Sequence, residues 1–185
     1  MIDSLCDRAE EKGLAVAWLY CDYLAHQEQS ATAMLGAILK QLVSIGEIPE
    51  NIRQTFRRQF SDRGLRLSDI VGMLKKTCSL LSSVYICIDA LDESTSKSRQ
   101  ELLESLRGIV QESPSMRVLF TGRSYVEEEV KKYFTRIITI PVSPTRGGIR
   151  MYLSMRLGRD TEPKAMDGDL RKDIMRIIPK IISGM

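Results

Sequence analysis

The fold of this chain is best predicted from the stretch SSVYICIDALDES, residues 82–94. Residues 84–88 suit a buried strand and run directly into Asp89, and Asp92 and Glu93 follow three and four positions later. Asp and Ser are also common in exposed turns between a strand and a helix. On composition alone, such a turn and a functional site are equal alternatives.

Three further segments are as continuously apolar as residues 84–88, a pattern typical of strands covered on both faces of a parallel sheet. They are LAVAWLYC at 14–21, MRVLFT at 116–121 and RIITI at 136–140. Apolar residues recur at helical spacing in 30–45, 68–82 and 98–112, and a shorter helix is expected at 125–134. This alternation predicts an α/β fold with three layers, a parallel sheet with helices on both faces.

A proline- and glycine-rich break, PVSPTRGG at 141–148, separates the α/β pattern from a purely helical one. Beyond it, apolar residues recur at helical spacing over 149–157 and again over 170–181. The sequence therefore predicts an α/β core in residues 1–143 and the start of a helical region in residues 144–185.

The composition argues against several classes of partner. Hydrophobic residues at 43% and charged residues at 28% are ordinary for a soluble globular protein, and a net charge of +3 does not indicate nucleic acid or membrane. The arginines within residues 53–66 are interpreted as a solvated helix face. No apolar run reaches the ~18 residues of a membrane span, and the N-terminus lacks the layout of a signal peptide. We expect a cytoplasmic protein that binds neither nucleic acid nor membrane.

Cysteine and histidine offer little for metal or covalent chemistry. The four cysteines (Cys6, Cys21, Cys78, Cys87) stand singly in apolar surroundings without C-x-x-C spacing, which indicates small buried hydrophobes in a reducing compartment. His26 is the one histidine in the sequence, so an imidazole-based triad or metal site is not expected.

The acidic stretch has the pattern of a magnesium-binding strand end. Ligands of open α/β sheets bind outside the carboxyl ends of the strands, where Asp89 is predicted to lie. In nucleotide-hydrolysing folds an apolar strand that ends in Asp holds Mg²⁺, and one or two carboxylates suffice for this ion. An acid a few positions on, Asp92 or Glu93, can orient or deprotonate a water. A calcium loop starting at Asp89 is disfavoured, because its sixth position is not glycine.

A second strand end supports this interpretation. MRVLFTGRS is another apolar strand, and it ends in Thr121 and Arg123. A hydroxyl and a guanidinium at a neighbouring strand end can sense or neutralise a γ-phosphate.

With these two motifs, nearly the whole chain resembles the NACHT-type STAND signalling NTPases, and in particular the nephrocystin-like NACHT proteins common in fungi. VYICIDALDE is similar to the family's Walker B segment and RVLFTGRS to its sensor strand, in which Gly122 and Ser124 replace the usual serine and proline. The resemblance implies Mg²⁺ and ATP or ADP as cofactors of the intact domain. It implies Asp89 as the Mg²⁺ ligand, Thr121 as cofactor-binding, Asp92 and Glu93 as water-orienting acids and Arg123 as the γ-phosphate sensor.

The family's phosphate-binding loop has no counterpart here. The Walker A pattern G-x-x-x-x-G-K-[ST] needs a Gly-Lys dipeptide, and the sequence contains none. By resemblance the chain begins inside the helix that follows this loop and stops before the family's later helices. We expect a fragment of a P-loop NTPase fold without its central strand, with weak or absent nucleotide binding. The edges of 117–121 and 136–140 would then be unpaired and prone to association.

Two functional classes follow from these observations. The first is a nucleotide-dependent switch, of which these residues form an incomplete part and whose intact form would be a nucleoside-triphosphatase. The second is a non-catalytic interaction module derived from a degenerate NACHT domain, and a pseudogene product is a third possibility. Protein partners or self-association are expected in either of the first two, and no small-molecule substrate is indicated beyond the nucleotide.

Overall fold

The computed structural model describes residues 14–25, 28–45, 54, 66–159 and 167–182. The chain divides into two compact units, Met1–Ile137 and Ile138–Met185. Among the residues singled out above, Cys6, His26 and the arginines of 53–63 lie outside the described part. Cys21, Cys78 and Cys87 are buried as predicted.

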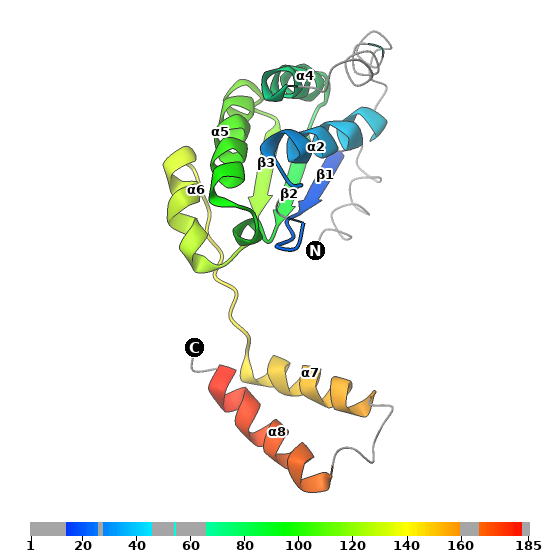
Figure 1. Ribbon diagram of the computed structural model, residues 1–185, viewed down its shortest axis with the longest axis vertical. Coiled ribbons are helices and arrows are strands. Elements are labelled where there is room, and N and C mark those ends of the chain that lie inside the picture. Colours follow the sequence, from blue (N-terminus) through cyan, green and yellow to red (C-terminus); the bar gives the residue numbers. More distant parts are fainter. Residues whose placement is uncertain (1–13, 26–27, 46–53, 55–65, 160–166, 183–185) are drawn as a thin grey trace. The chain divides into compact units, whose positions relative to one another are not determined.

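The first unit is built on a parallel sheet of three strands in the order β1-β2-β3 (Figure 1). Strand β1 spans Ala15–Tyr20, β2 spans Val84–Asp89 and β3 spans Met116–Phe120. Three of the four predicted strands and the α/β class are thereby confirmed. The register places the last residues of β1 and β2, Tyr20 and Asp89, opposite each other.

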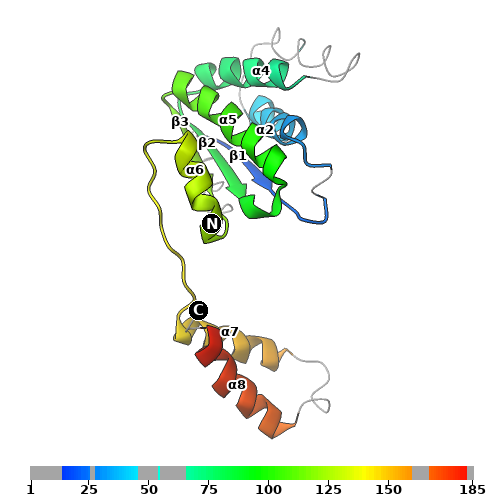
Figure 2. The same ribbon diagram turned by 60° about the vertical axis from the view of Figure 1, so that its left-hand side comes forward.

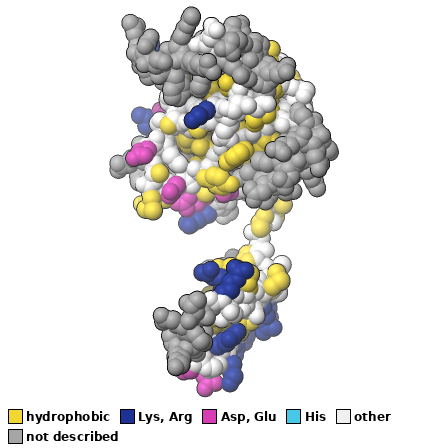
Figure 3. Space-filling model, turned by 90° about the vertical axis from the view of Figure 1, so that its right-hand side faces the viewer, with side chains coloured by type: hydrophobic (Ala, Val, Ile, Leu, Met, Phe, Trp, Pro, Cys, Tyr) yellow, Lys and Arg dark blue, Asp and Glu magenta, His cyan; other side chains and the backbone are white. Residues whose placement is uncertain are grey.

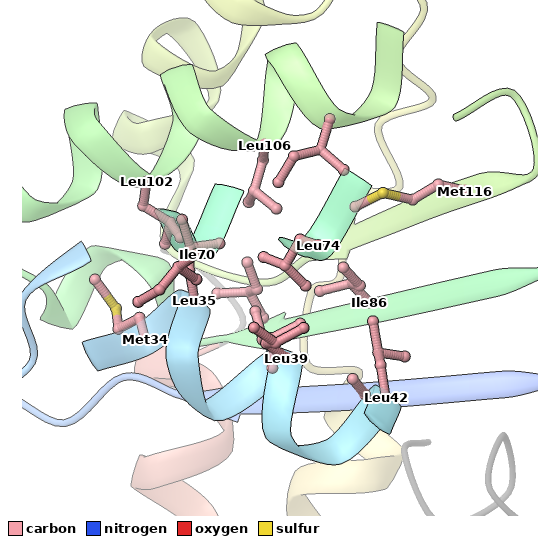
Figure 4. Packing of buried hydrophobic residues seen from close by; sticks show 14 of the residues in the cluster. Met34, Leu35, Leu39, Leu42, Ile70, Leu74, Ile86, Leu102, Leu106 and Met116 are labelled. Atoms are coloured by element: carbon pink, nitrogen blue, oxygen red, sulfur yellow. The ribbon is translucent and has the colours of Figure 1, made fainter. Parts of the chain in front are cut away.

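Three helices pack on one face of this sheet: α2 (Ala31–Ile45), α4 (Leu67–Leu80) and α5 (Ser96–Glu112) (Figures 1 and 2). They form where apolar residues recur every three or four positions, because this spacing places them on one side of a helix. Fully buried side chains from the three helices meet those of the strands (Figure 4). Burying each large aliphatic side chain stabilises the fold by about 1.5–3 kcal/mol. Examples are Leu35, Leu39, Leu42, Leu74, Ile86, Leu102 and Leu106.

The opposite face of the sheet is more exposed. It carries Trp18 and Tyr20 of β1 and Leu119 of β3, which are 38%, 52% and 38% exposed. Helices α2, α4 and α5 all lie on the other face, so the described residues show two of the three predicted layers.

Residues 136–140 do not form the predicted fourth strand, and this prediction is wrong. No strand is assigned to them, and Ile138 and Ile140 are 91% and 76% exposed. A strand needs a neighbour to satisfy its backbone groups, and among the described residues none pairs with this segment or with the outer edge of β3. The apolar run is therefore present without the partner that would make it a strand.

A short 3-10 helix, η2 (Ser124–Val126), and helix α6 (Glu127–Tyr133) follow β3 directly. Val126 and Val130 are buried, and the rings of Phe120 and Phe134 pack with centroids 5.6 Å apart at a tilt of 52°. These contacts attach α6 to the end of β3.

The second unit contains the two helices predicted after the break, α7 (Arg146–Gly158) and α8 (Gly168–Ile182), which pack on each other. Thr145 caps α7, since its hydroxyl accepts the backbone N–H of Gly148 at 3.1 Å. Lys and Arg side chains gather on the face of this unit seen in Figure 3. Among the described helices, none combines the length and the apolar character that crossing a membrane requires.

Candidate functional site

The acidic stretch and the sensor-like stretch meet at the carboxyl ends of the strands. Backbone pairing continues past the strands: the N–H of Thr121 donates to the carbonyl of Ile88 at 2.9 Å, and the N–H of Leu91 donates to the carbonyl of Thr121 at 2.9 Å. The N–H of Cys21, after β1, donates to the carbonyl of Asp89 at 3.0 Å. The parallel arrangement thus brings three segments far apart in sequence to one edge of the sheet.

Asp89 and Thr121 contact each other at this edge. The Thr121 hydroxyl donates to Asp89 Oδ1 and accepts the backbone N–H of Ala90 at 3.0 Å. Both residues are half-buried. The hydroxyl therefore fixes one carboxylate oxygen of Asp89 and the start of the following turn at once.

Ala90 turns the chain sharply after β2. Its φ of 53° and ψ of 46° lie in the left-handed region, which a residue with a Cβ occupies at a cost of about 1 kcal/mol. The turn leads into a short 3-10 helix, η1 (Leu91–Glu93), anchored by the fully buried Leu91. This geometry presents Asp92 and Glu93 beside the strand ends.

Asp92 is bound to Arg123. Its Oδ1 accepts the backbone N–H of Arg123 at 3.3 Å, and its Oδ2 lies 3.4 Å from the Arg123 Nε. The Tyr125 hydroxyl donates to the backbone carbonyl of Asp92 at 3.4 Å. Only 7% of the Asp92 side chain is exposed, against 73% of the Arg123 side chain. The buried carboxylate of Asp92 thus contacts the backbone and the side chain of Arg123, while the guanidinium stays exposed to solvent.

Glu93 differs from Asp92 in its surroundings. Its backbone N–H donates to the carbonyl of Ala90 at 2.9 Å, which closes the turn. Its carboxylate is half-buried and has no hydrogen-bond or ion-pair partner among the described residues. Of the two acids after Asp89, Glu93 is the one whose oxygens remain available.

Gly122 makes the approach of Asp92 to Arg123 possible. A Cβ at this position would lie 3.0 Å from Val126 Cγ2 and 3.2 Å from Asp92 Oδ1, both tighter than ordinary contacts. The packing therefore favours a residue without a side chain at this position.

Cys21 is a buried residue whose thiol pKa is affected by the carboxylates of Asp89 and Asp92. Burial, and to a smaller extent the carboxylates of Asp89 and Asp92, raise the pKa of its thiol to about 11, although a hydrogen bond from Ser94 lowers it. The thiol is therefore protonated at neutral pH and is not a nucleophile there.

Two residues near the site were missed by the sequence interpretation, Arg99 of α5 and Glu129 of α6. The Arg99 Nε lies 2.7 Å from Glu129 Oε2, and its Nη1 donates to the backbone carbonyl of Ser94 at 2.8 Å. A signal was present in the sequence, because Arg99 falls on the same helical stripe as Leu102, Leu103 and Leu106. A charged residue on an apolar stripe predicts a buried partner.

No group of three or more His, Cys, Asp or Glu side chains that could hold a metal ion by itself occurs in the described part of the chain. A shallow hollow of about 360 Å³ lies between α4 and α5, and its lining includes none of the candidate site residues at the strand ends.

The sequence model of the family described as nephrocystin 3, N-terminal, matches residues 1–123. The match covers about two-thirds of the chain and includes both strand ends of the site, up to Arg123. The chain belongs to the nephrocystin 3 N-terminal family. Comparison with curated proteins and with solved structures gives no match. The nephrocystin-like part of the predicted resemblance is therefore confirmed, and the site described above lies within the matched nephrocystin 3 N-terminal segment.

Proposed function

We propose that this chain carries the metal- and γ-phosphate-facing edge of a NACHT-type nucleotide switch, in which ATP or ADP with Mg²⁺ biases two conformations of a larger signalling protein. The observation that supports this most is the convergence of Asp89, Thr121 and Arg123 at the carboxyl edge of a parallel sheet. Ligands of open α/β sheets bind at this edge.

Asp89 fits the role of the Mg²⁺ ligand. The Thr121 hydroxyl donates to Asp89 Oδ1, whereas Asp89 Oδ2 has no partner among the described residues. Magnesium keeps several waters and takes further ligands from phosphate oxygens, so one carboxylate is a sufficient protein contribution. A bound Mg²⁺ would neutralise charge on the phosphates. The lack of a larger cluster of ligands in the described residues agrees with a site that needs the nucleotide to complete it.

The other polar residues divide the remaining tasks. The exposed guanidinium of Arg123 can bind a phosphate oxygen, since arginine presents a planar fork of donors to such groups. Glu93 is the better candidate to orient a water, because its carboxylate has no partner among the described residues. Asp92, proposed from the sequence for the same task, is the weaker candidate, because its carboxylate contacts Arg123.

Nucleotide binding also requires a cradle for the phosphates, and the sequence contains no Gly-Lys dipeptide to form one. The 185 residues alone are therefore proposed to bind magnesium nucleotide weakly or not at all. Hydrolysis would be a property of the domain completed by a phosphate-binding loop.

A second candidate function, a non-catalytic interaction module, is favoured by one observation. The outer edge of β3 pairs with no described strand, and Ile138, Ile140 and Val142 on the segment after α6 are 91%, 76% and 91% exposed. Unpaired edges and exposed apolar side chains favour association with another protein or with a second copy of the chain.

Calorimetric titration separates the two. The chain is compared with a version extended at its N-terminus by the strand and G-x-x-x-x-G-K-[ST] loop of another family member. The switch predicts that the extended chain binds Mg-ATP, that Asp89→Asn abolishes the magnesium dependence, and that Arg123→Ala weakens binding of ATP more than of ADP. Arg107→Ala, on the exposed side of α5, serves as the matched control.

Two outcomes would overturn these proposals. A folded extended chain that binds no nucleotide contradicts the switch and leaves the interaction module. Low-micromolar binding by the 185 residues alone, lost in Asp89→Asn, contradicts the requirement for the missing loop.

A further inference from the structure

Arg99 is a charged residue that is nevertheless buried, at 7% exposure. It lies at the start of α5, four residues after the capping Thr95. A positive charge near the N-terminus of a helix is opposed by the helix dipole, so it does not stabilise α5 from there. Its retention at a buried position needs another reason.

The guanidinium of Arg99 joins two segments of the candidate site. Its Nη1 donates to the carbonyl of Ser94, two residues after Asp92, at 2.8 Å, and the Ser94 hydroxyl donates to the carbonyl of Leu91 at 2.7 Å. Its Nε lies 2.7 Å from Glu129, six residues after Arg123. One side chain therefore contacts both the turn that carries Asp92 and the helix that follows Arg123.

The contacts of Arg99 are shorter and more buried than those between Asp92 and Arg123. The side chains of Arg99 and Glu129 are 9% and 18% exposed, whereas the Asp92–Arg123 contacts are 3.3 and 3.4 Å long and lie partly at the surface. An ion pair with one exposed partner contributes little to fixing its own geometry. The position of Arg123 relative to Asp92 therefore depends also on the contacts that hold the two segments, among them those of Arg99.

Stability does not explain the Arg99–Glu129 pair. Taking two charges out of water costs about as much as their attraction returns. In addition, Glu129 Oε1 is buried without a hydrogen-bond partner among the described residues. Two apolar side chains would fill this place at no greater cost.

We propose that Arg99 and Glu129 are a positioning pair, which holds the acidic turn and α6 at the separation that lets Asp92 hold Arg123. An arginine serves here because its planar fork donates in two directions at once, which a lysine ammonium on a flexible stem does not reproduce. A role of this pair in phosphate sensing rests on the proposed function, whereas its effect on the contact between Asp92 and Arg123 does not.

Nuclear magnetic resonance of the ¹⁵N-labelled 185-residue chain, without nucleotide, tests the geometry directly. The Nε–Hε signal of Arg123, assigned by its loss in Arg123→Lys, is recorded in the wild type and in Asp92→Asn, where its partner is neutral. In the double variant Arg99→Met with Glu129→Leu, both charges are removed and side-chain bulk is kept, so the chain is expected to fold. Its Arg123 signal is expected to move most of the way to the Asp92→Asn position and to exchange faster with water.

Arg99→Lys provides a second variant if the double variant does not fold, and it is expected to shift the signal in the same direction. Glu112→Gln is the control, because it breaks the ion pair between Lys75 and Glu112 at 2.6 Å, which joins α4 and α5. It must leave the Arg123 signal in place. The proposal is overturned if the signal keeps its wild-type position in the folded double variant or in Arg99→Lys, or if Glu112→Gln moves it equally. Since no nucleotide is present, a failed nucleotide titration has no bearing on this result.

Discussion

Asp92 and Arg123 are 31 positions apart in the sequence, yet Asp92 accepts the backbone N–H of Arg123 at 3.3 Å and lies 3.4 Å from its Nε. The carboxylate is almost fully buried and the guanidinium is exposed. The acid is thus part of the scaffold, and the arginine is the group it presents to solvent.

Gly122→Ala is expected to loosen this pair and to destabilise the chain by about 1–3 kcal/mol, the usual cost of overpacking. The added methyl group would lie 3.0 Å from Val126 and 3.2 Å from Asp92 Oδ1. Urea denaturation measures the change in the free energy of unfolding.

Gly108→Ala is the matched control for Gly122→Ala. A Cβ at Gly108, inside α5, meets nothing within 4 Å, and alanine is favoured over glycine in a helix by roughly 0.8–1.0 kcal/mol. Gly108→Ala should therefore stabilise the chain. If both substitutions change stability in the same direction, the packing argument for Gly122 is wrong.

Ala90→Gly is expected to raise the free energy of unfolding by about 0.5–1 kcal/mol. Ala90 has a positive φ of 53°, and glycine adopts this region without the penalty that a Cβ brings. Ala37→Gly, at an exposed position of α2, should lower stability by about 1 kcal/mol. Thermal unfolding measures both changes. If Ala90→Gly stabilises the chain and Ala37→Gly destabilises it, the strain at Ala90 is confirmed; if both change stability in the same direction, it is refuted.

Much of the site could be predicted from the sequence, because periodicity locates strand ends and parallel strands bring those ends together. Asp89 and Thr121 were placed correctly at one edge on this basis alone. Residues 136–140 were not, since their apolar run carries no information on whether a neighbouring strand is present. The contact of Asp92, and not Glu93, with Arg123 also could not be predicted, because adjacent acids in a 3-10 helix point in different directions and sequence spacing does not say which one meets Arg123.

Thr121→Val is expected to destabilise the chain by about 1–3 kcal/mol, the cost of leaving buried polar groups unpaired. The hydroxyl donates to Asp89 and accepts the Ala90 N–H, and valine keeps the shape of threonine while removing both bonds. Thr121→Ser keeps the hydroxyl and loses one methyl group, which costs about 0.8 kcal/mol. A serine variant less stable than the valine variant in urea would show that the hydroxyl does not bridge these groups.

The buried thiols Cys21 and Cys78 predict a loss of stability at alkaline pH. Burial raises the pKa of each from its ordinary value of 9.0 to about 11. Between these pKa values the thiols of the unfolded chain have released protons that the folded chain retains, so rising pH favours unfolding. Below about pH 9 the thiols are protonated in both states and do not change the free energy of unfolding. Each thiol contributes a loss of roughly 2–3 kcal/mol by pH 11.

Urea denaturation between pH 8 and pH 11 is the measurement for the thiols. The variant with Cys21→Ala and Cys78→Ala has a lower baseline, because two buried side chains are truncated, and a shallower decline above pH 9. An equally steep decline in this variant would assign the alkaline loss to lysine or tyrosine residues instead.

Ile138→Lys with Val142→Lys is expected to reduce self-association of the chain. Both side chains are 91% exposed, so the substitutions remove apolar surface without disturbing a core, and added charge opposes apolar contact between copies. Figure 3 shows hydrophobic atoms on the segment that follows α6. Leu24→Lys is the control, since Leu24 is 90% exposed and belongs to the first unit, not to the substituted segment. Sedimentation velocity over a range of concentrations should show a smaller weight-average mass for the double variant and an unchanged one for the control. Equal behaviour of wild type and double variant would place the associating surface elsewhere, with the outer edge of β3, which pairs with no described strand, the next segment to substitute.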